Sequence, residues 1–253
     1  MKKITKNFSL ISLRKDQLWC ESDLLALKKA NNSCWSRVQK DLLELYNYKC
    51  AYCQTDLKRM MPTVEHYRPK SKNKYFWLAH EWTNFLPCCT ICQKEKSDIF
   101  ETENPPKYDP PLLVNGNLDY EKCRLDSEYL LSEQALILNP EFDDPFEHFD
   151  LNDKNGELLP KKDSKKAELT IKIIKLNRLQ LQYSRKKTID DFWEDFNNYY
   201  EFFLEKKNTQ KESFELATQL SKKNCERKIR ENVEYSFVWL YLLNNFEKIL
   251  AEN

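Results

Sequence analysis

Apolar residues recur at helical spacing in several long stretches of the chain, and charged residues fill many of the positions between them. Turn-forming residues are few, and this pattern is typical of a mostly helical protein. We expect helices over 23–30 and 35–48. The apolar face of the second helix would be formed by Val38, Leu42, Leu43 and Leu45. A single basic helix is expected within 161–187, and two or three more within 189–250.

Two stretches interrupt the helical pattern and divide the chain. The first follows residue 48 and contains most of the cysteines. The second, 103–111, contains four prolines, which cannot lie inside a helix, so we interpret it as a linker. The predicted division is an N-terminal helical segment at 1–48, a cysteine-containing module at 49–104 and a mainly helical region at 105–253.

Two groups of aromatic and apolar residues near the C-terminus each have two interpretations. The first group is Trp193, Phe196, Tyr200 and Phe203. The second group is Phe237, Trp239, Tyr241, Leu242 and Phe246. Aromatic residues are enriched at the centres of protein interfaces, so both groups are candidate docking faces for a partner. Apolar stripes on helices also form intramolecular cores, and both interpretations stay open.

Composition excludes several classes of protein. The chain has 253 residues, with 41 Lys and Arg against 40 Asp and Glu, so its net charge of +1 indicates neither nucleic-acid nor membrane binding. Its two glycines, Gly116 and Gly156, cannot build a glycine-rich phosphate loop, so a nucleotide hydrolase working with it would be another chain. The longest apolar candidate, 235–243, is too short to cross a bilayer. We expect a soluble, cytoplasmic protein with no membrane contact.

The cysteines are the strongest chemical signal. Thiols of a cytoplasmic chain stay reduced, so we treat them as candidate metal ligands and not as disulfides. Two C-x-x-C pairs stand out, Cys50 with Cys53 and Cys89 with Cys92. Two such turns can close a tetrahedral shell of four thiolates around one structural zinc ion. Cys88 could replace Cys89 if the second turn were shifted, although the spacing favours Cys89. The cysteines without ligand spacing, which we assign to the core, are Cys20, Cys34, Cys123 and Cys225.

Three further motifs complete a recognisable series. A Glu65-His66 pair precedes Pro69 by a short interval, Asn84 is followed by two apolar residues, and Lys96 follows the last cysteine. Together with the two C-x-x-C pairs, this series resembles the HNH (ββα-metal) endonucleases that have a zinc-knuckle frame. The stretches 77–82, 138–145, 170–171 and 176–178 make the chain more similar to the HNH nuclease subunit of Septu-type and retron-associated anti-phage systems. The resemblance covers about 35–187.

The resemblance implies an α+β fold, mostly α, in which a zinc-knuckled ββα-metal module is inserted among helices. It implies that His66 is the general base that polarises a water, and that Glu65 is a ligand of a catalytic Mg²⁺ or Mn²⁺ ion. Asn84 would fix the loop that carries the histidine. Gln93 stands where the family has His or Asn as the second metal ligand. Because glutamine is longer than asparagine, Asp98 or Glu95 remains an alternative ligand.

Substrate and partners are implied in the same way. Six basic residues against one acid lie within 58–74, and Arg68 and Lys70 belong to this patch. We expect Arg68 and Lys96 to grip the phosphate beside the scissile bond. DNA is the default substrate, and RNA, including tRNA, stays open. The implied partners are an ABC-type ATPase and, in retron systems, a reverse transcriptase with its non-coding RNA.

The sequence has two other histidines and is open to two other functions. His80 lies in an aromatic patch and is interpreted as a packed residue, whereas His148 lies in an acidic segment and is assigned to structure or to substrate contact. A catalytically degenerate, zinc-stapled adaptor is the main alternative to the nuclease, because Gln93 departs from the family. A thiol redox protein is disfavoured because no thioredoxin-like βαβ pattern accompanies either cysteine pair.

Overall fold

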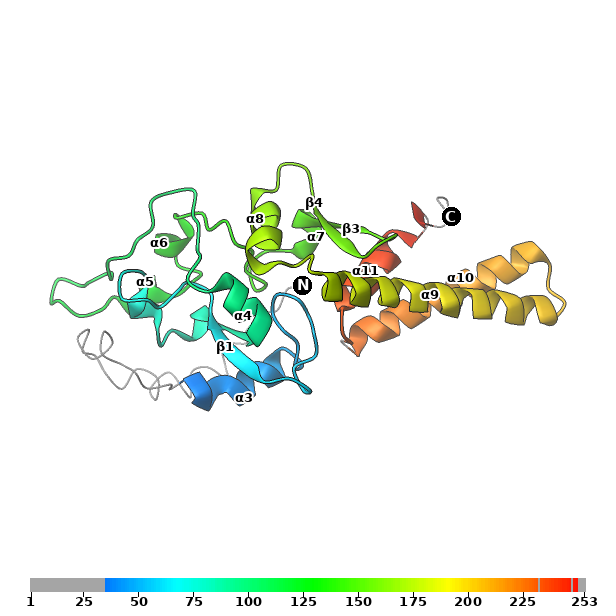
Figure 1. The fold of residues 1–253 in the computed structure, drawn as a ribbon, viewed down its shortest axis with the longest axis horizontal. Helices are drawn as coiled ribbons and strands as arrows, with labels where there is room; N and C mark the ends of the chain where they lie inside the picture. Colours follow the sequence, from blue (N-terminus) through cyan, green and yellow to red (C-terminus); the bar gives the residue numbers. More distant parts are fainter. Residues whose placement is uncertain (1–34, 232, 247, 250–253) are drawn as a thin grey trace.

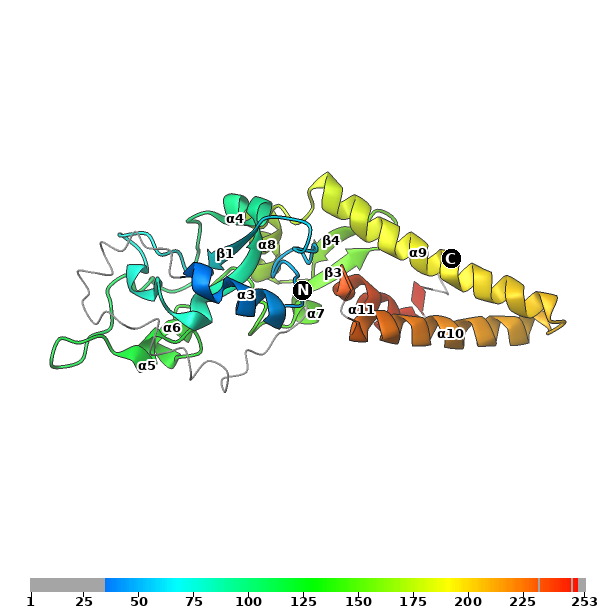
Figure 2. The same ribbon diagram turned by 90° about the horizontal axis from the view of Figure 1, so that it is seen from below.

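The computed structural model describes residues 35–231, 233–246 and 248–249, and these form a mostly helical α+β protein with two small two-stranded sheets (Figure 1). The expected helix at 23–30 lies outside the described residues. The molecule is elongated, because a long helical hairpin extends away from the part that contains the first sheet (Figure 2). Within the described residues, no helix combines the length and the apolar character that a membrane crossing requires.

The helix expected at 35–48 is α3, which spans Trp35–Leu45. Val38 and Leu42 are buried, as expected from the apolar spacing, and α3 packs against both strands of the first sheet. The helix ends earlier than expected because Asn47 and Tyr48 adopt positive φ angles of 49° and 57°. Left-handed residues cannot continue a right-handed helix.

The first sheet pairs β1, Pro62–His66, with β2, Phe85–Cys89. The strands are antiparallel, and their register places His66 opposite Phe85. Two single-turn helices, η1 at Phe76–Leu78 and η2 at Trp82–Asn84, lie between the strands. Helix α4, Thr90–Lys96, begins directly after β2 and contacts both strands. The two strands and the helix therefore form one unit, in which the end of β1 lies beside the start of β2 and the end of α4.

The segment after α4 is irregular, with three four-residue helices and a hairpin. The helices are α5 at Tyr120–Cys123, α6 at Glu128–Leu131 and α7 at Pro145–His148. The hairpin pairs β3, Phe149–Asn152, with β4, Glu157–Pro160. The proline-rich stretch contains no helix or strand, as expected, but it is tied down: the Asn104 amide donates to the Glu133 carbonyl at 3.1 Å. The division of the chain at 104 stays a prediction.

The prediction of one helix over 161–187 is wrong. The structure has two, α8 at Lys165–Ile174 and α9 at Leu179–Glu205. Lys175 ends α8 in the left-handed region at φ 51°. The break lets the Asn177 side chain bond to the backbone of Leu158 in β4, with its Oδ1 accepting at 2.9 Å and its Nδ2 donating at 2.8 Å. A continuous helix could not place Asn177 against that strand.

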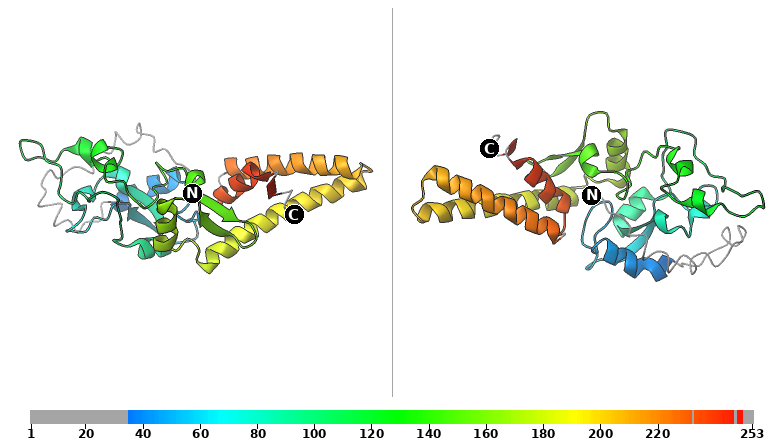
Figure 3. Two further views of the ribbon diagram at one scale, coloured as in Figure 1. Left: turned by 90° about the horizontal axis from the view of Figure 1, so that it is seen from above. Right: turned by 180° about the vertical axis from the view of Figure 1, so that it is seen from behind.

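Helix α9 forms the long hairpin with α10, Gln210–Arg230, and α11, Ser236–Asn244, closes the near end (Figure 3). Several aromatic residues in this part belong to the protein's own core. Phe196 is buried and meets the rings of Phe214 and Phe246 at 5.6 Å and 6.3 Å. The residues of the second aromatic group are all buried as well. The docking interpretation is therefore replaced by the intramolecular one for the second group, whereas the other three residues of the first group are only half-buried and both interpretations stay open for it.

Gly156 fixes the hairpin β3–β4 against α9. Its φ is +73°, and a Cβ built there would lie 2.3 Å from the Gln182 carbonyl oxygen and 2.7 Å from the Lys186 nitrogen. Only glycine allows two backbones to approach this closely. The buried Arg185 of α9 strengthens the contact, because its Nε donates to the Gly156 carbonyl at 2.6 Å.

Candidate metal centre and active site

Four cysteine sulfurs gather where α3, β1, β2 and α4 meet. The Sγ atoms of Cys50, Cys53, Cys89 and Cys92 all lie within 4.8 Å of one another, and all four residues are buried. None of the cysteines in the described residues forms a disulfide. A zinc ion with four sulfur ligands at about 2.3 Å requires sulfur atoms about 3.8 Å apart. The Cys53 and Cys89 sulfurs are 3.8 Å apart, so the group could hold a metal such as zinc.

Local structure explains why the second cysteine pair converges. Cys89 ends β2 and caps α4, where its Sγ accepts a hydrogen bond from the Cys92 amide at 3.4 Å. A C-x-x-C pair at a strand-to-helix junction thus presents both sulfurs on one side. Cys88 is also buried, with its sulfur 3.9 Å from that of Cys50, but it is not a member of the four-sulfur group. Cys123 and Cys225 are buried apart from the group, whereas Cys20 and Cys34 lie outside the described residues.

Sequence reasoning missed one residue at this centre, Arg178. Arg178 is the N-cap residue of α9. Its Nη1 and Nη2 donate to the Cys92 Sγ, at 3.6 Å and 3.5 Å. Burial lowers the pKa of the Arg178 guanidinium, but the negative charge of the sulfur group outweighs this effect and raises it. No spacing rule could have found a contact between residues 86 positions apart. The guanidinium links the helical part of the chain to the sulfur group.

The predicted acid lies at the end of β1 and faces α4. Glu65 is buried, and its Oε1 accepts a hydrogen bond from the Lys96 Nζ at 2.7 Å. Gln93, one turn before Lys96, hydrogen-bonds the Glu65 carboxylate, and its Nε2 donates to the Val64 carbonyl at 3.3 Å. Burial raises the pKa of the Glu65 carboxyl, and Lys96 opposes that shift. The two predicted ligands of a catalytic cation are therefore neighbours, but an ammonium group already neutralises one of them.

The predicted general base is the next residue. His66 is 7 % exposed; its ring meets the edge of Phe85, and its Nε2 lies 3.0 Å from the Ala79 carbonyl oxygen. A carbonyl oxygen can only accept, so Nε2 carries the proton and Nδ1 carries the lone pair of the neutral ring. Burial lowers the pKa of His66 to about 3, and the bond to Ala79 offsets only part of this shift. The ring is therefore uncharged at neutral pH.

Asn84 holds the backbone that follows the histidine. It is fully buried at the end of η2, and its Oδ1 accepts from the Arg68 amide at 2.8 Å. Its Nδ2 donates to the carbonyls of Arg68 at 3.0 Å and Leu78 at 3.3 Å. The side chain thus bonds both backbone groups of Arg68 and ties them to η1. The Asn84 side-chain amide therefore fixes the backbone two residues after His66.

Two of the three predicted phosphate contacts differ from expectation. Arg68 is 3 % exposed and pairs with Glu133, and it stacks over Tyr75 and Phe100. Lys96 is fully buried and also donates to the His66 carbonyl at 3.0 Å. Both cations are used inside the protein, so the prediction that they grip a phosphate is corrected to a structural role. Lys70 is exposed, as a phosphate contact would be.

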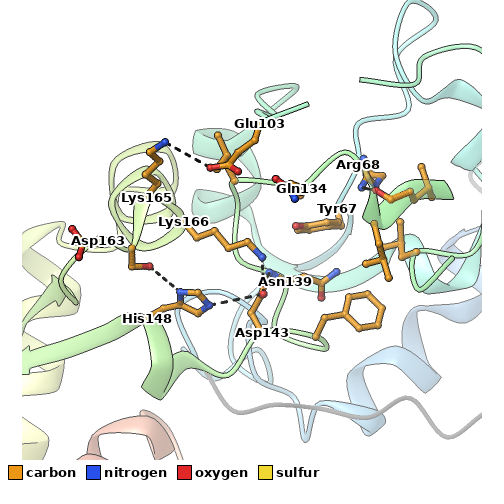
Figure 4. A pocket seen from close by; sticks show the side chains of 17 residues that line it. Tyr67, Arg68, Glu103, Gln134, Asn139, Asp143, His148, Asp163, Lys165 and Lys166 are labelled. Carbon is orange, nitrogen blue, oxygen red and sulfur yellow. Dashed lines mark hydrogen bonds and ion pairs between the residues drawn. The ribbon is translucent and has the colours of Figure 1, made fainter. Parts of the chain in front are cut away.

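The other two histidines lie in different settings, and His80 is close to His66 because it follows Ala79, the residue whose carbonyl bonds the His66 ring. His80 is half-buried after η1. His148 ends α7, with its Nδ1 2.8 Å from the Ser164 Oγ and its Nε2 4.0 Å from an Asp143 carboxylate oxygen (Figure 4). The Ser164 hydroxyl also caps α8. His148 therefore joins the acidic segment to the start of α8 and lines a cavity there.

No protein-family model matches the chain, and no solved structure matches it. Among curated proteins, it is 30% identical over 166 residues to Septu protein PtuA of Bacillus mycoides strain KBAB4, covering 61% of this chain and 21% of the relative. It is 30% identical over 167 residues to Septu protein PtuB of the same strain, covering 61% and 51%. A 92-residue match to Septu protein PtuB of Bacillus thuringiensis is 32% identical and covers 35% and 32%. The chain is therefore similar to Septu proteins over about three fifths of its length, and it spans about half the length, or less, of the relatives it matches.

Proposed function

We propose that this protein is an HNH-type, metal-dependent endonuclease that acts as the effector of a Septu-type anti-phage defence complex. The observation that carries the proposal is the arrangement of β1, β2 and α4. It places Glu65 and His66 at the end of one strand, with Gln93 beside Glu65 and four buried sulfurs at the start of the helix. Similarity to Septu proteins supports the defence role.

The zinc ion belongs to the frame of the proposed enzyme. A Cys₄ shell leaves no coordination position for water, so zinc would stabilise the fold without taking part in hydrolysis. Metal binding in small zinc modules contributes about 10–16 kcal/mol to folding. Here it would hold the start of α4, and thereby Gln93 and Lys96, against β1.

The chemistry of cleavage would come from His66 and Glu65. The neutral His66 ring can take a proton from the attacking water at Nδ1, because Ala79 holds the proton on Nε2. Glu65 and Gln93 offer the oxygen atoms that Mg²⁺ or Mn²⁺ prefers. Such an ion would neutralise phosphate charge and stabilise the departing oxygen. Asn84 would keep the backbone beyond the histidine in register with this pair.

Substrate and partners extend the proposal. DNA is the default substrate and RNA, including tRNA, is the second; exposed Lys70 remains a candidate phosphate contact. The partner is an ABC-type ATPase on another chain, with a reverse transcriptase and its non-coding RNA in retron-linked systems. The absence of a glycine-rich phosphate loop from the sequence is consistent with an ATPase on another chain.

The test is cleavage by the full chain, alone and with its ATPase partner, on labelled DNA and on tRNA with Mg²⁺ or Mn²⁺. We expect His66→Ala to abolish cleavage, because alanine removes the ring nitrogen that would accept the proton. His80→Ala is the matched control and is expected to cut normally. Equal cleavage by the His66→Ala variant and the unchanged chain would refute the general-base assignment.

A zinc-stapled adaptor without nuclease activity is the second candidate, and one observation favours it. The Lys96 ammonium lies 2.7 Å from Glu65 Oε1, where it supplies the positive charge that a divalent cation would otherwise supply. Binding of Mn²⁺, followed by electron paramagnetic resonance, separates the two functions. The nuclease requires a Mn²⁺ site that Glu65→Gln removes, whereas the adaptor has no such site in either form.

A further inference from the structure

A second polar site lies on the other side of the residues that follow β1. It is a cavity of about 670 Å³ between Tyr67, the segment around Asn139, and the start of α8 (Figure 4). Cavities of roughly 300–1,000 Å³ are typical of small-molecule sites. Its lining combines buried hydrogen-bond donors with apolar side chains. Neither the four-sulfur group nor the proposed catalytic residues explain this combination.

The first unexplained donor is the amide of Asn139. The residue is 2 % exposed, and its Oδ1 accepts from the Glu141 amide at 2.9 Å. A backbone N–H can only donate, so this contact fixes the orientation of the amide and makes the other atom an NH₂ group. That Nδ2 has no hydrogen-bond partner among the described residues. Buried donors are nearly always paired, so an orphaned one in a cavity wall indicates a missing acceptor.

The second unexplained donor is the Nε of Arg68, which lines the same cavity. The rest of its guanidinium is used, since Nη1 pairs with Glu133 and Nη2 donates to the Leu130 carbonyl at 3.0 Å. Within the described residues, the Nε–H has no acceptor. Two residues that lie 71 positions apart, each with a buried N–H donor that lacks an acceptor among the described residues, thus line one cavity. A ligand that satisfies both must present acceptor atoms.

The charges of the lining argue for a ligand without net charge. Three cations, Arg68, Lys165 and Lys166, are balanced by three anions, Glu103, Asp143 and Asp163. Four of these charges form two ion pairs, Lys166 with Asp143 at 2.7 Å and Lys165 with Glu103 at 3.7 Å (Figure 4). A phosphate would have to break these pairs, whereas an uncharged polar group would not. The remaining lining combines uncharged polar side chains with apolar and aromatic ones, among them Phe142.

We propose that this cavity binds a nucleobase, either in a free nucleoside or as an unpaired base of a single strand. Bases are uncharged planar rings with carbonyl oxygens and ring nitrogens, which are the acceptors that Asn139 and Arg68 lack. Their flat faces stack on aromatic side chains such as Tyr67 and Phe142. The site uses none of the proposed catalytic or metal-ligating residues, so this proposal does not depend on the proposed nuclease activity.

The decisive variant is Asn139→Asp. Aspartate keeps the acceptor that Glu141 needs and replaces only the orphaned donor with a second acceptor. Asn115→Asp is the matched control, because Asn115 Oδ1 also accepts from a backbone amide two residues on, at 3.1 Å, in an exposed loop. Binding of adenosine, guanosine, cytidine and uridine to the full chain is measured by calorimetry, with inorganic phosphate as competitor. A labelled single-stranded oligonucleotide and its duplex form the second arm.

We expect at least one nucleoside or the single strand to bind, and Asn139→Asp to weaken that binding by about tenfold or more. Asn115→Asp and inorganic phosphate should have no effect. Binding of nucleosides identifies the free source, and binding of the single strand alone identifies the strand. Leu131→Trp is a second blocking variant, since Leu131 lines the cavity and is 53 % exposed, so a larger side chain fills the opening without disturbing the core. Equal binding by the two aspartate variants, displacement by phosphate, or no binding in either arm would overturn the proposal.

Discussion

Replacing Arg178 with methionine should weaken zinc binding without touching a ligand. Four thiolates around Zn²⁺ leave about two net negative charges in a buried site. Arg178 donates from both Nη atoms to the Cys92 sulfur, at 3.6 Å and 3.5 Å, and so supplies the nearest compensating charge from outside the β1–β2–α4 unit. Methionine keeps most of the length of the side chain and removes both the charge and the donors.

The magnitude follows from the kind of contact. Removing a partner that hydrogen-bonds a metal ligand typically lowers metal affinity by about 10–100-fold. Arg178 is half-buried, so solvent screens part of its charge, and we expect the lower end, about tenfold, or about 1.4 kcal/mol. Arg178→Lys should lie between the two, because an ammonium keeps the charge but cannot fork onto one sulfur.

The assay is competition for zinc against a coloured chelator, with thermal unfolding of the zinc-loaded protein as a second readout. Arg124→Met is the matched control, because Arg124 pairs with Asp126 in the exposed α5–α6 region. Arg178→Met should release zinc at a lower chelator concentration than Arg124→Met. Zinc affinities that agree within about twofold for the two variants would show that the contact to Cys92 carries no binding energy.

Three further substitutions test the zinc ligands, the contact of Gly156 with α9 and the packing of Phe246. Cys89→Ala should lose the bound zinc and unfold at a lower temperature, whereas Cys88→Ala should retain one equivalent after dialysis; retention by both, measured by atomic absorption, would contradict the assigned ligand set. Gly156→Ala should lower the free energy of unfolding by about 3–5 kcal/mol in denaturant titrations, because its Cβ would meet α9 backbone atoms, whereas Gly116→Ala, with open space around it, should cost only about 1 kcal/mol. Phe246→Ala should cost about 3–5 kcal/mol, since the ring is 2 % exposed; an unchanged midpoint would restore its interpretation as a docking surface.

The parts of the structure that depend on near neighbours in the sequence could be predicted from it. The apolar spacing from Val38 onward is set by the helix period, so the buried face of α3 follows from the sequence alone. The two cysteine pairs are local turns, and their convergence needs only one hairpin between them. The break at Lys175 could not be predicted, because it depends on the contact of Asn177 with β4, which lies 19 positions away.

The ion pairs of the site could not be predicted from the sequence for a related reason. A lysine or arginine beside a proposed catalytic pair indicates a phosphate contact only if its charge is not already used within the fold. Arg68 finds Glu133 65 positions later, and Lys96 reaches back 31 positions to Glu65. Neither pairing leaves a local pattern, so sequence reasoning placed both cations on the surface.

These internal pairs bear directly on how the proposed site would work. Lys96 bonds both the Glu65 carboxylate and the His66 carbonyl, so it holds the end of β1 against α4. Arg178 attaches the start of α9 to the same helix through Cys92. Helix α4 is therefore the element on which the sulfur group, the acid and the long hairpin all converge.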